Sequence, residues 1–351
     1  MKTLLIGAAA IVCGALAASG QSIARNPYVG AIVVDASNGS VLFEDGADRP
    51  GYPASMLKLM DLFLVFDQAE MGRLALTDMV QVTKEAAEIG GSQVYLDVRE
   101  SFTVEDLLYA LAIQSANDAA MALAIHVAGS RDGFVQMMND KARELGLSPV
   151  TRFQSPHGLP PGAGQRPDMT TARDFAVLCR ALLDEHPEVL KYTSATFRVF
   201  RQNPLFEMRT HNRLLGTVAG CDGLKTGYFK DAGYSVAATV QRNGARIVVV
   251  VLGSIDRKTR DDKVTELVAR YMPMAARKIQ AEPAPAAVQS APVPEPAADV
   301  VADPEEGEEG AEAEHPEAKK SRGRTAGAVA IVAFAAVVVA MAVRRRLLLT
   351  R

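Results

Sequence analysis

The sequence predicts an α+β fold, in which an antiparallel sheet is flanked by helices and further helices form a subdomain. Three observations support this fold class. A hairpin pattern opens the body of the chain at residues 30–44, helical patterns dominate residues 55–184, and strand patterns with a closing helix fill residues 197–279. We expect the N-terminal hairpin and the C-terminal strands to share one antiparallel sheet.

The elements follow from local patterns in chain order. Two β-branched runs on either side of Asn38-Gly39 are typical of a hairpin. Pro53 precedes an apolar run over residues 55–66, which predicts a largely buried helix ending near Gly72. Further helices are expected at residues 104–113, 117–127, 132–145, 172–184 and 261–279, and strands at residues 197–200, 223–227, 234–240 and 247–251.

The two ends of the chain differ from this body. Residues 1–24 combine Lys2, an uncharged apolar stretch and a small-residue end, which is typical of a secretory signal peptide; the alternative is a buried N-terminal helix. Residues 325–343 carry no charge and would form a helix of roughly 28 Å, close to the thickness of a bilayer. We therefore expect an exported body, a transmembrane helix and a short basic cytoplasmic tail at residues 344–351.

The segment between body and anchor, residues 281–324, is rich in Pro, Ala and Glu and predicts a disordered tether. Local charges of −9 over residues 281–320 and +6 over residues 321–351 nearly cancel in the whole-chain charge of −3. Residues 25–280, the expected single folded domain, are therefore almost neutral, which argues against nucleic-acid binding. The acidic run could instead bind a basic partner.

Patterns for metal and cofactor sites are missing. The sequence has no Gly-x-Ser-x-Gly, His-Glu-x-x-His, phosphate-loop or Cys-x-x-Cys pattern, and no metal or cofactor is expected. The scattered histidines of the body are interpreted as structural or surface residues: His126, His157, His186 and His211. Cys179 and Cys221 could form one disulfide or be two ordinary core residues, and the sequence leaves both open.

Three short patterns carry the chemistry: Ser55-x-x-Lys58, Ser115-x-Asn117 and Lys225-Thr226-Gly227. Ser55 and Lys58 are neighbours on one helix face. A serine hydroxyl needs a base within hydrogen-bond reach, and a lysine beside a second cation can be neutral often enough to act as that base. Each pattern also has a structural interpretation. Ser55 and Lys58 could be a capping serine and a surface lysine, and Ser115 and Asn117 could simply separate two helices. Lys225-Thr226-Gly227 could be a strand end where glycine permits the close approach of another backbone or a ligand.

Together the patterns resemble those of the penicillin-recognising serine acyl-enzymes. The chain is most similar to the low-molecular-mass penicillin-binding proteins that are D-alanyl-D-alanine carboxypeptidases, which implies a β-lactamase/transpeptidase-like fold. The similarity covers about residues 27–275. It is carried by Pro53-Ala-Ser-Met-Leu-Lys-Leu-Met60, Gln114-Ser-Ala-Asn-Asp-Ala-Ala120, Phe153-Gln-Ser-Pro-His-Gly-Leu159 and Asp222-Gly-Leu-Lys-Thr-Gly-Tyr228 with Ala232-Gly-Tyr234.

The resemblance implies a role for each matched catalytic residue. Ser55 would attack the carbonyl between two terminal D-alanines and form an acyl-enzyme. Lys58 would be the general base, and Ser115 would relay the proton to the leaving amine. Asn117 would hold the peptide amide of the substrate, and Lys225 would supply positive charge.

The residues implied to bind substrate are Gly91, Ser92, Thr226, Gly227, Tyr228 and Arg260. Thr226 would hydrogen-bond the terminal carboxylate, and the backbone N–H groups of Ser55 and Tyr228 would form the oxyanion hole. Arg260 is the candidate for reading the free carboxylate, with a surface arginine at a helix start as the alternative. Asp61 stands where the family more often has Thr.

The expected function is that of a carboxypeptidase anchored in the inner (cytoplasmic) membrane, with its catalytic domain in the periplasm. It would trim peptidoglycan stem peptides that end in D-Ala-D-Ala, and β-lactams such as penicillin would acylate it. A β-lactamase is a close alternative, although the chain lacks a Glu-x-x-Leu-Asn stretch between the second and third motifs. The patterns also leave open an endopeptidase that cuts D-Ala cross-links and a catalytically silent peptidoglycan-binding anchor.

Overall fold

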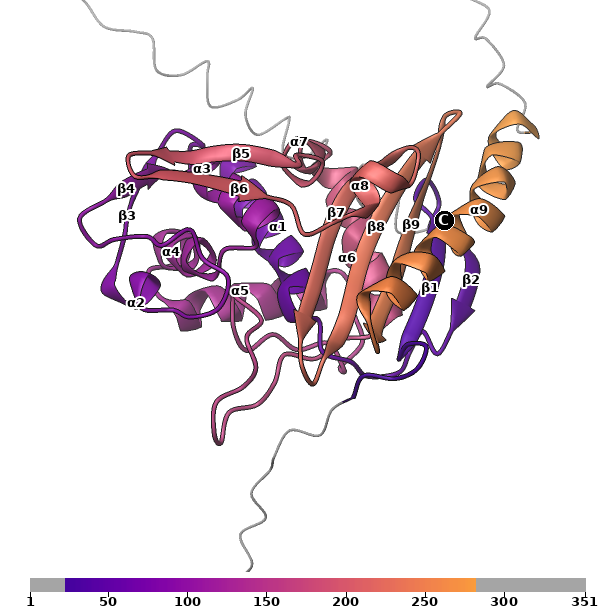
Figure 1. Cartoon of the computed structure of the whole chain (residues 1–351), viewed down its shortest axis with the longest axis horizontal. Helices are drawn as coiled ribbons and strands as arrows, with labels where there is room; N and C mark the ends of the chain where they lie inside the picture. The colour runs from indigo at the N-terminus through magenta and orange to yellow at the C-terminus, as the bar shows by residue number, and fades with distance from the viewer. Residues whose placement is uncertain (1–22, 282–351) are drawn as a thin grey trace, which may run out of the picture. The chain divides into compact units, whose positions relative to one another are not determined.

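The centre of the molecule is a five-stranded antiparallel sheet with the strand order β2-β1-β9-β8-β7 (Figure 1). The structure, a computed structural model, describes residues 23–281. Strand β1 pairs with β2 on one side and with β9 on the other, so segments from both ends of the described chain lie side by side. The predicted α+β fold is confirmed, and so is the sharing of one sheet by the N-terminal hairpin and the strands predicted at residues 223–227, 234–240 and 247–251.

Most predicted elements are present, with ends shifted by a few residues. The strands are β1 (Gly30–Asp35), β2 (Val41–Asp45), β3 (Met79–Gln81), β4 (Ser101–Thr103), β5 (Phe197–Gln202), β6 (Leu205–Arg209), β7 (Cys221–Phe229), β8 (Gly233–Arg242) and β9 (Ala245–Ser254). The helices are α1 (Lys58–Glu70), α2 (Lys84–Ala87), α3 (Val104–Tyr109), α4 (Asn117–Ala128), α5 (Arg131–Glu144), α6 (Ala172–Glu185), α7 (Val189–Thr193), α8 (Leu214–Thr217) and α9 (Arg257–Ala281). A 3-10 turn, η1 (Ala54–Leu57), precedes α1, and a π-helical turn, η2 (Ala110–Gln114), follows α3.

The sheet separates two hydrophobic cores, because successive side chains of a strand point to opposite faces. On one face Val249 of β9 lies in a core with Val264 of α9. On the other face Val250 joins a larger core that includes Leu62 of α1 and Phe175 of α6. Burial on both faces explains why residues 247–252 of β9 are a continuous run of Ile, Val and Leu rather than an alternating pattern.

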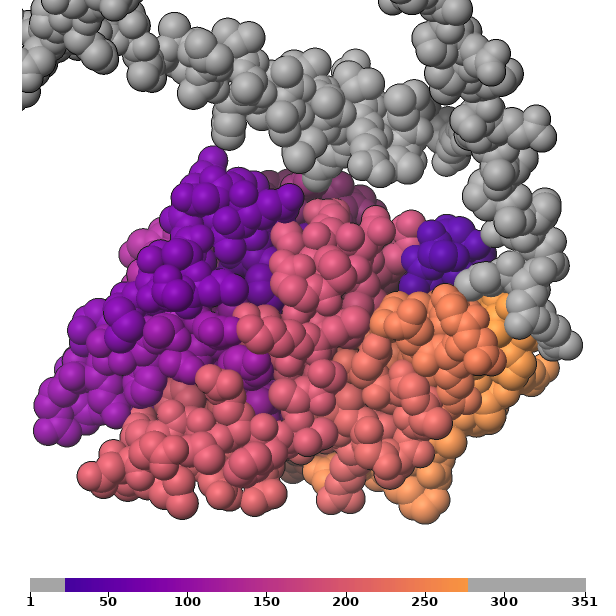
Figure 2. All heavy atoms as spheres, turned by 90° about the horizontal axis from the view of Figure 1, so that it is seen from above, coloured from indigo at the N-terminus to yellow at the C-terminus, as the bar shows by residue number. Residues whose placement is uncertain are grey.

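The strand predicted at residues 197–200 does not join the main sheet. It is β5, which pairs only with β6, and this hairpin lies against the helical part of the molecule (Figures 1 and 2). Arg201 attaches it there by donating hydrogen bonds to the carbonyls of Val94 and Tyr95 and by pairing with Glu100. Strand β6 was not predicted, since its sequence contains no β-branched residue.

Several expectations lie outside the described residues. Residues 1–22, most of the predicted signal peptide, and residues 282–351, which hold the predicted tether, transmembrane helix and tail, are not described. Within residues 23–281, no helix combines the length and the apolar character needed to cross a bilayer. Cys179 and Cys221 are free thiols, so they do not form a disulfide in this structure.

Candidate active site

The candidate nucleophile, Ser55, lies in the 3-10 turn η1, so the predicted helix becomes α-helical one turn later than expected. Ala54, directly before it, is fully buried and has a φ of +47°. Two glycines hold this turn: a Cβ on Gly227 would lie 2.4 Å from the backbone oxygen that precedes Ala54, and a Cβ on Gly158 would lie 2.3 Å from the oxygen of Ala54 itself. Close packing from both sides maintains the strained backbone beside Ser55.

The side chain of Lys58 is fully buried, and its Nζ has three hydrogen-bond partners. These are the hydroxyl of Ser55 at 3.0 Å, Oδ1 of Asn117 at 2.8 Å and the backbone oxygen of His157 at 2.7 Å. Burial lowers the pKa of Lys58 to about 8. The last two partners can only accept, so a neutral Lys58 can donate to both and direct its lone pair at the Ser55 proton. This geometry suits a general base.

The second motif supplies an unpaired hydroxyl and a fixed amide. Ser115 follows the turn η2 in a left-handed conformation with a φ of +62°, and its buried Oγ has no hydrogen-bond partner among the described residues. Asn117 donates from Nδ2 to the oxygen of Gly90 at 2.8 Å, while its backbone N–H donates to the oxygen of Ser92 at 2.7 Å. Because Lys58 donates to Oδ1 and Nδ2 donates to Gly90, the side-chain amide of Asn117 is held in one orientation.

The loop predicted to edge the groove is packed directly on this motif. Gly91 has a φ of +82°, and a Cβ on it would lie 2.5 Å from Nδ2 of Asn117. Ser92 donates from its hydroxyl to the backbone oxygen of Gln114 at 2.7 Å. Both residues therefore help to shape the wall of the site.

The third motif lies on β7, which runs past η1. Lys225 is 2% exposed, and burial, followed by the charges of Lys58 and Arg260, holds its pKa well below the ordinary value. Tyr228 is exposed at the end of the motif, where its ring stacks on Tyr234 with a centroid distance of 4.1 Å. Strand β7 thus contributes one buried cation and one exposed tyrosine, which stacks on the half-buried Tyr234 of β8.

These elements enclose a cavity of about 250 Å³. The residues that line it are Ser55, Ser92, Ser115, His211, Thr226, Gly227, Tyr228, Tyr234, Arg257 and Arg260. Seven of the predicted site residues are among them. The other four lie next to the cavity. Lys58 is hydrogen-bonded to Ser55, and Asn117 is hydrogen-bonded to Lys58. Gly91 packs on Asn117, and Lys225 is the buried residue before Thr226.

Three residues that line the cavity were not predicted to belong to the site. Tyr234 is part of the stretches that carry the family resemblance but had no expected role, His211 was interpreted as structural or surface, and Arg257 was not singled out. No local pattern marks His211 or Arg257, because they lie in segments distant in sequence, the loop before α8 and the start of α9, that only the fold brings to one cavity.

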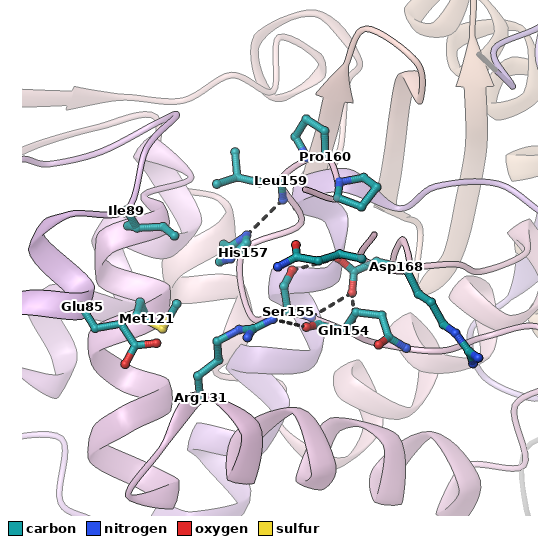
Figure 3. Close-up of a pocket in the computed structure, with 13 residues that line it drawn as sticks. Glu85, Ile89, Met121, Arg131, Gln154, Ser155, His157, Leu159, Pro160 and Asp168 are labelled. Atoms are coloured by element: carbon teal, nitrogen blue, oxygen red, sulfur yellow. Dashed lines mark hydrogen bonds between the residues drawn. The ribbon is translucent and has the colours of Figure 1, made fainter. Parts of the chain in front are cut away.

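A second cavity, of about 570 Å³, is lined by His157 but by neither Ser55 nor Lys58 (Figure 3). Its polar lining includes Arg131, Ser155 and Asp168, and Asp168 accepts hydrogen bonds from the backbone N–H and hydroxyl of Ser155. The His157 ring faces this cavity, whereas its backbone oxygen is bonded to Lys58. The smaller cavity is the candidate active site, because it contains the nucleophile.

Comparisons with known proteins agree with the motifs. A family described as D-alanyl-D-alanine carboxypeptidase matches residues 21–256. The chain is 32% identical over 275 residues to D-alanyl-D-alanine carboxypeptidase DacF of Bacillus subtilis, a match that covers 76% of this chain and 69% of DacF. It is 37% identical over 247 residues to D-alanyl-D-alanine carboxypeptidase DacC of Escherichia coli, covering 68% of this chain and 59% of DacC.

Solved structures show the same similarity. The fold matches penicillin-binding protein D2 from Listeria monocytogenes in its ampicillin-bound form with a TM-score of 0.63 and 31% identity, covering 69% of this chain and 96% of that one. It matches penicillin-binding protein 5 from Haemophilus influenzae with a TM-score of 0.65 and 29% identity, covering 70% and 71%. The chain belongs to the D-alanyl-D-alanine carboxypeptidase family of serine peptidases.

Proposed function

We propose that this protein removes the terminal D-alanine from peptidoglycan stem peptides through an acyl-enzyme on Ser55. The observation that carries the proposal is the environment of Lys58, which is buried, has a lowered pKa and lies 3.0 Å from the Ser55 hydroxyl. A weak nucleophile with an adjacent buried base is the arrangement that covalent catalysis requires.

In the proposed acylation, Ser55 Oγ attacks the carbonyl carbon of the scissile amide and Lys58 Nζ accepts the hydroxyl proton. The backbone N–H groups of Ser55 and Tyr228 stabilise the negative oxygen of the tetrahedral intermediate. When the carbon–nitrogen bond breaks, the D-alanine nitrogen receives a proton by way of Ser115. Water then hydrolyses the ester, and the Ser55 hydroxyl is regenerated.

The remaining site residues bind the substrate in this proposal. Asn117 accepts and donates hydrogen bonds along the peptide backbone, and Lys225 adds positive charge. Thr226 and Arg260 bind the terminal carboxylate at the inner end of the cavity. Ser92 and Gly227 form part of its wall, and Gly91 packs on Asn117.

The test is mass spectrometry of penicillin-treated protein combined with a D-alanine release assay on a peptide that ends in D-Ala-D-Ala. We expect one covalent adduct on Ser55 and release of D-alanine, and neither in a Ser55→Ala variant. An adduct on the variant would refute Ser55 as the nucleophile. Acylation without peptide hydrolysis would refute the carboxypeptidase proposal, and rapid turnover of the β-lactam would favour a β-lactamase.

We also propose that residues 1–24 direct export and that residues 325–343 anchor the enzyme in the inner membrane, with β-lactams acting from the periplasmic side. The support is the uncharged run of 19 residues at 325–343, followed by three arginines. Full-length protein should stay in the membrane fraction after alkaline extraction, whereas a variant that ends at residue 324 should be released. Retention of the truncated variant would contradict the proposed anchor.

A further inference from the structure

Two arginines, Arg257 and Arg260, line the active-site cavity. Thr226 and His211 line it as well, and the charge of Arg257 acts on both Arg260 and His211. Lys225, which precedes Thr226 on β7, is buried, and the charge of Arg260 acts on it. The two arginines differ in whether their positive charge is already balanced by a protein carboxylate or is free to pair with a ligand.

Arg260 is already engaged with the protein. It is 2% exposed, and both Nε and Nη2 donate to Oδ1 of Asp261, at 2.8 and 2.7 Å. Its Nη1 donates to the backbone oxygen of Ser235 on β8 at 3.2 Å. The charge of Arg260 is thus largely balanced, and the side chain joins the start of α9 to the sheet.

Arg257 lines the same cavity but is exposed, and its guanidinium makes no hydrogen bond or ion pair with any residue in the described part of the chain. It is the first residue of α9, where a cation opposes the helix dipole. The preceding Asp256 does not pair with it but accepts hydrogen bonds from the N–H and hydroxyl of Thr259. Helix stability therefore does not explain an arginine at this position.

The neighbouring groups show how close the unpaired charge is. Burial lowers the pKa of Arg260, and the charge of Arg257 acts in the same direction. Although His211 is exposed, partial desolvation at the cavity wall, followed by the charges of Lys225 and Arg257, lowers its pKa to about 4. His211 is therefore neutral at pH 7, and Arg257 is the accessible, unbalanced cation of this cavity.

We propose that Arg257 is a specificity-determining residue that forms an ion pair with the terminal carboxylate of the substrate from the outer side of the cavity. This inference rests on the proposed function and extends it. Arg260 and Thr226 define where the carboxylate lies, while Arg257 supplies the part of recognition that depends on net charge. A guanidinium suits this role because it offers several N–H donors to a planar carboxylate.

The experiment compares three substrates: a peptide ending in D-Ala-D-Ala, the same peptide with a C-terminal amide, and an uncharged activated ester. In Arg257→Gln we expect KM for the free acid to rise roughly 10- to 100-fold, the loss typical of a charge-assisted hydrogen bond, with kcat little changed. Hydrolysis of the amide and acylation by the ester should match wild type. The salt dependence of kcat/KM for the free acid should also weaken.

Lys258→Gln is the matched control, because Lys258 is the next residue, is exposed and pairs with Asp262 outside the cavity. It removes the same charge and should behave as wild type. An unchanged KM for the free acid in Arg257→Gln would overturn the inference, as would equal losses on acid, amide and ester. A wild-type enzyme that releases no D-alanine would instead refute the proposed function.

Discussion

The protonation state of Lys58 should control the pH dependence of the reaction. Lys58 must be neutral to accept the Ser55 proton, and burial lowers its pKa to about 8. We therefore expect kcat/KM for D-alanine release to rise as the pH increases through about 8 and then to level off. Lys58→Arg, which stays charged at every accessible pH, should lose at least about 100-fold in acylation rate. A flat profile between pH 6 and 9 would contradict Lys58 as the base.

Asp61 is a buried carboxyl group whose oxygens make no hydrogen bond within the described residues. It lies one turn after Lys58 and is fully buried. Burial raises its pKa well above the ordinary value. Its contribution to stability is thus most favourable below the unfolded pKa of about 4 and is lost as the pH rises towards the folded pKa.

Asp61→Thr should accordingly stabilise the fold at neutral pH, since a threonine hydroxyl can donate to the carbonyl one turn earlier in the helix. We expect a gain of about 1–3 kcal/mol at pH 7.5, the range for relieving a buried unpaired polar group, and little gain at pH 4. Urea unfolding at the two pH values measures this difference. A variant that is less stable at pH 7.5 would indicate an ionised Asp61 that pairs with Lys58.

At the scale of elements, the position of the nucleophile depends on contact between β7 and η1. A Cβ on Gly227 would lie 2.4 Å from a backbone oxygen of the turn, so Gly227→Ala must displace either the strand or the turn. A displacement of about 1 Å at the reacting atoms typically lowers the reaction rate about 100-fold. We expect that loss in β-lactam acylation. The control is Gly216→Ala in α8, where a Cβ meets nothing within 4 Å. Equal acylation rates in the two variants would show that the contact between Gly227 and η1 does not position Ser55.

The elements also show which features a sequence can predict. Helix α4 and strands β7 to β9 were predicted because each contains its own apolar pattern. The 3-10 turn at Ser55 was not, because its backbone is held by Gly158 and Gly227, which are distant in sequence. For the same reason the motifs predicted the reactive residues, whereas Arg257 and His211 emerged only when the start of α9 and the segment before β7 were brought to one cavity.

At the scale of the whole molecule, one buried polar cluster joins three helices outside the active site. Asp67 of α1 accepts from Lys141 of α5 at 2.7 Å and lies 2.8 Å from Nε2 of His186, the residue that ends α6. Burial alone would raise the pKa of Asp67, but hydrogen bonds from His186 and Lys141 hold it below the ordinary value. Burial alone would lower the pKa of His186, but the bond to Asp67 raises it.

This cluster should make global stability depend on pH. The pKa of His186 is higher in the folded state than the unfolded value of about 6.5, so its stabilisation is complete below pH 6.5 and is lost as the pH rises through the folded pKa. His186→Gln should therefore destabilise the protein more at pH 5.5 than at pH 9 in urea unfolding. Asp67→Asn should cost about 1.5–3 kcal/mol near neutrality, because Lys141 loses its short buried ion pair and keeps only the 3.5 Å pair with the half-exposed Glu144. An effect of His186→Gln that is equal at both pH values would show that the histidine stabilises the three helices by packing alone.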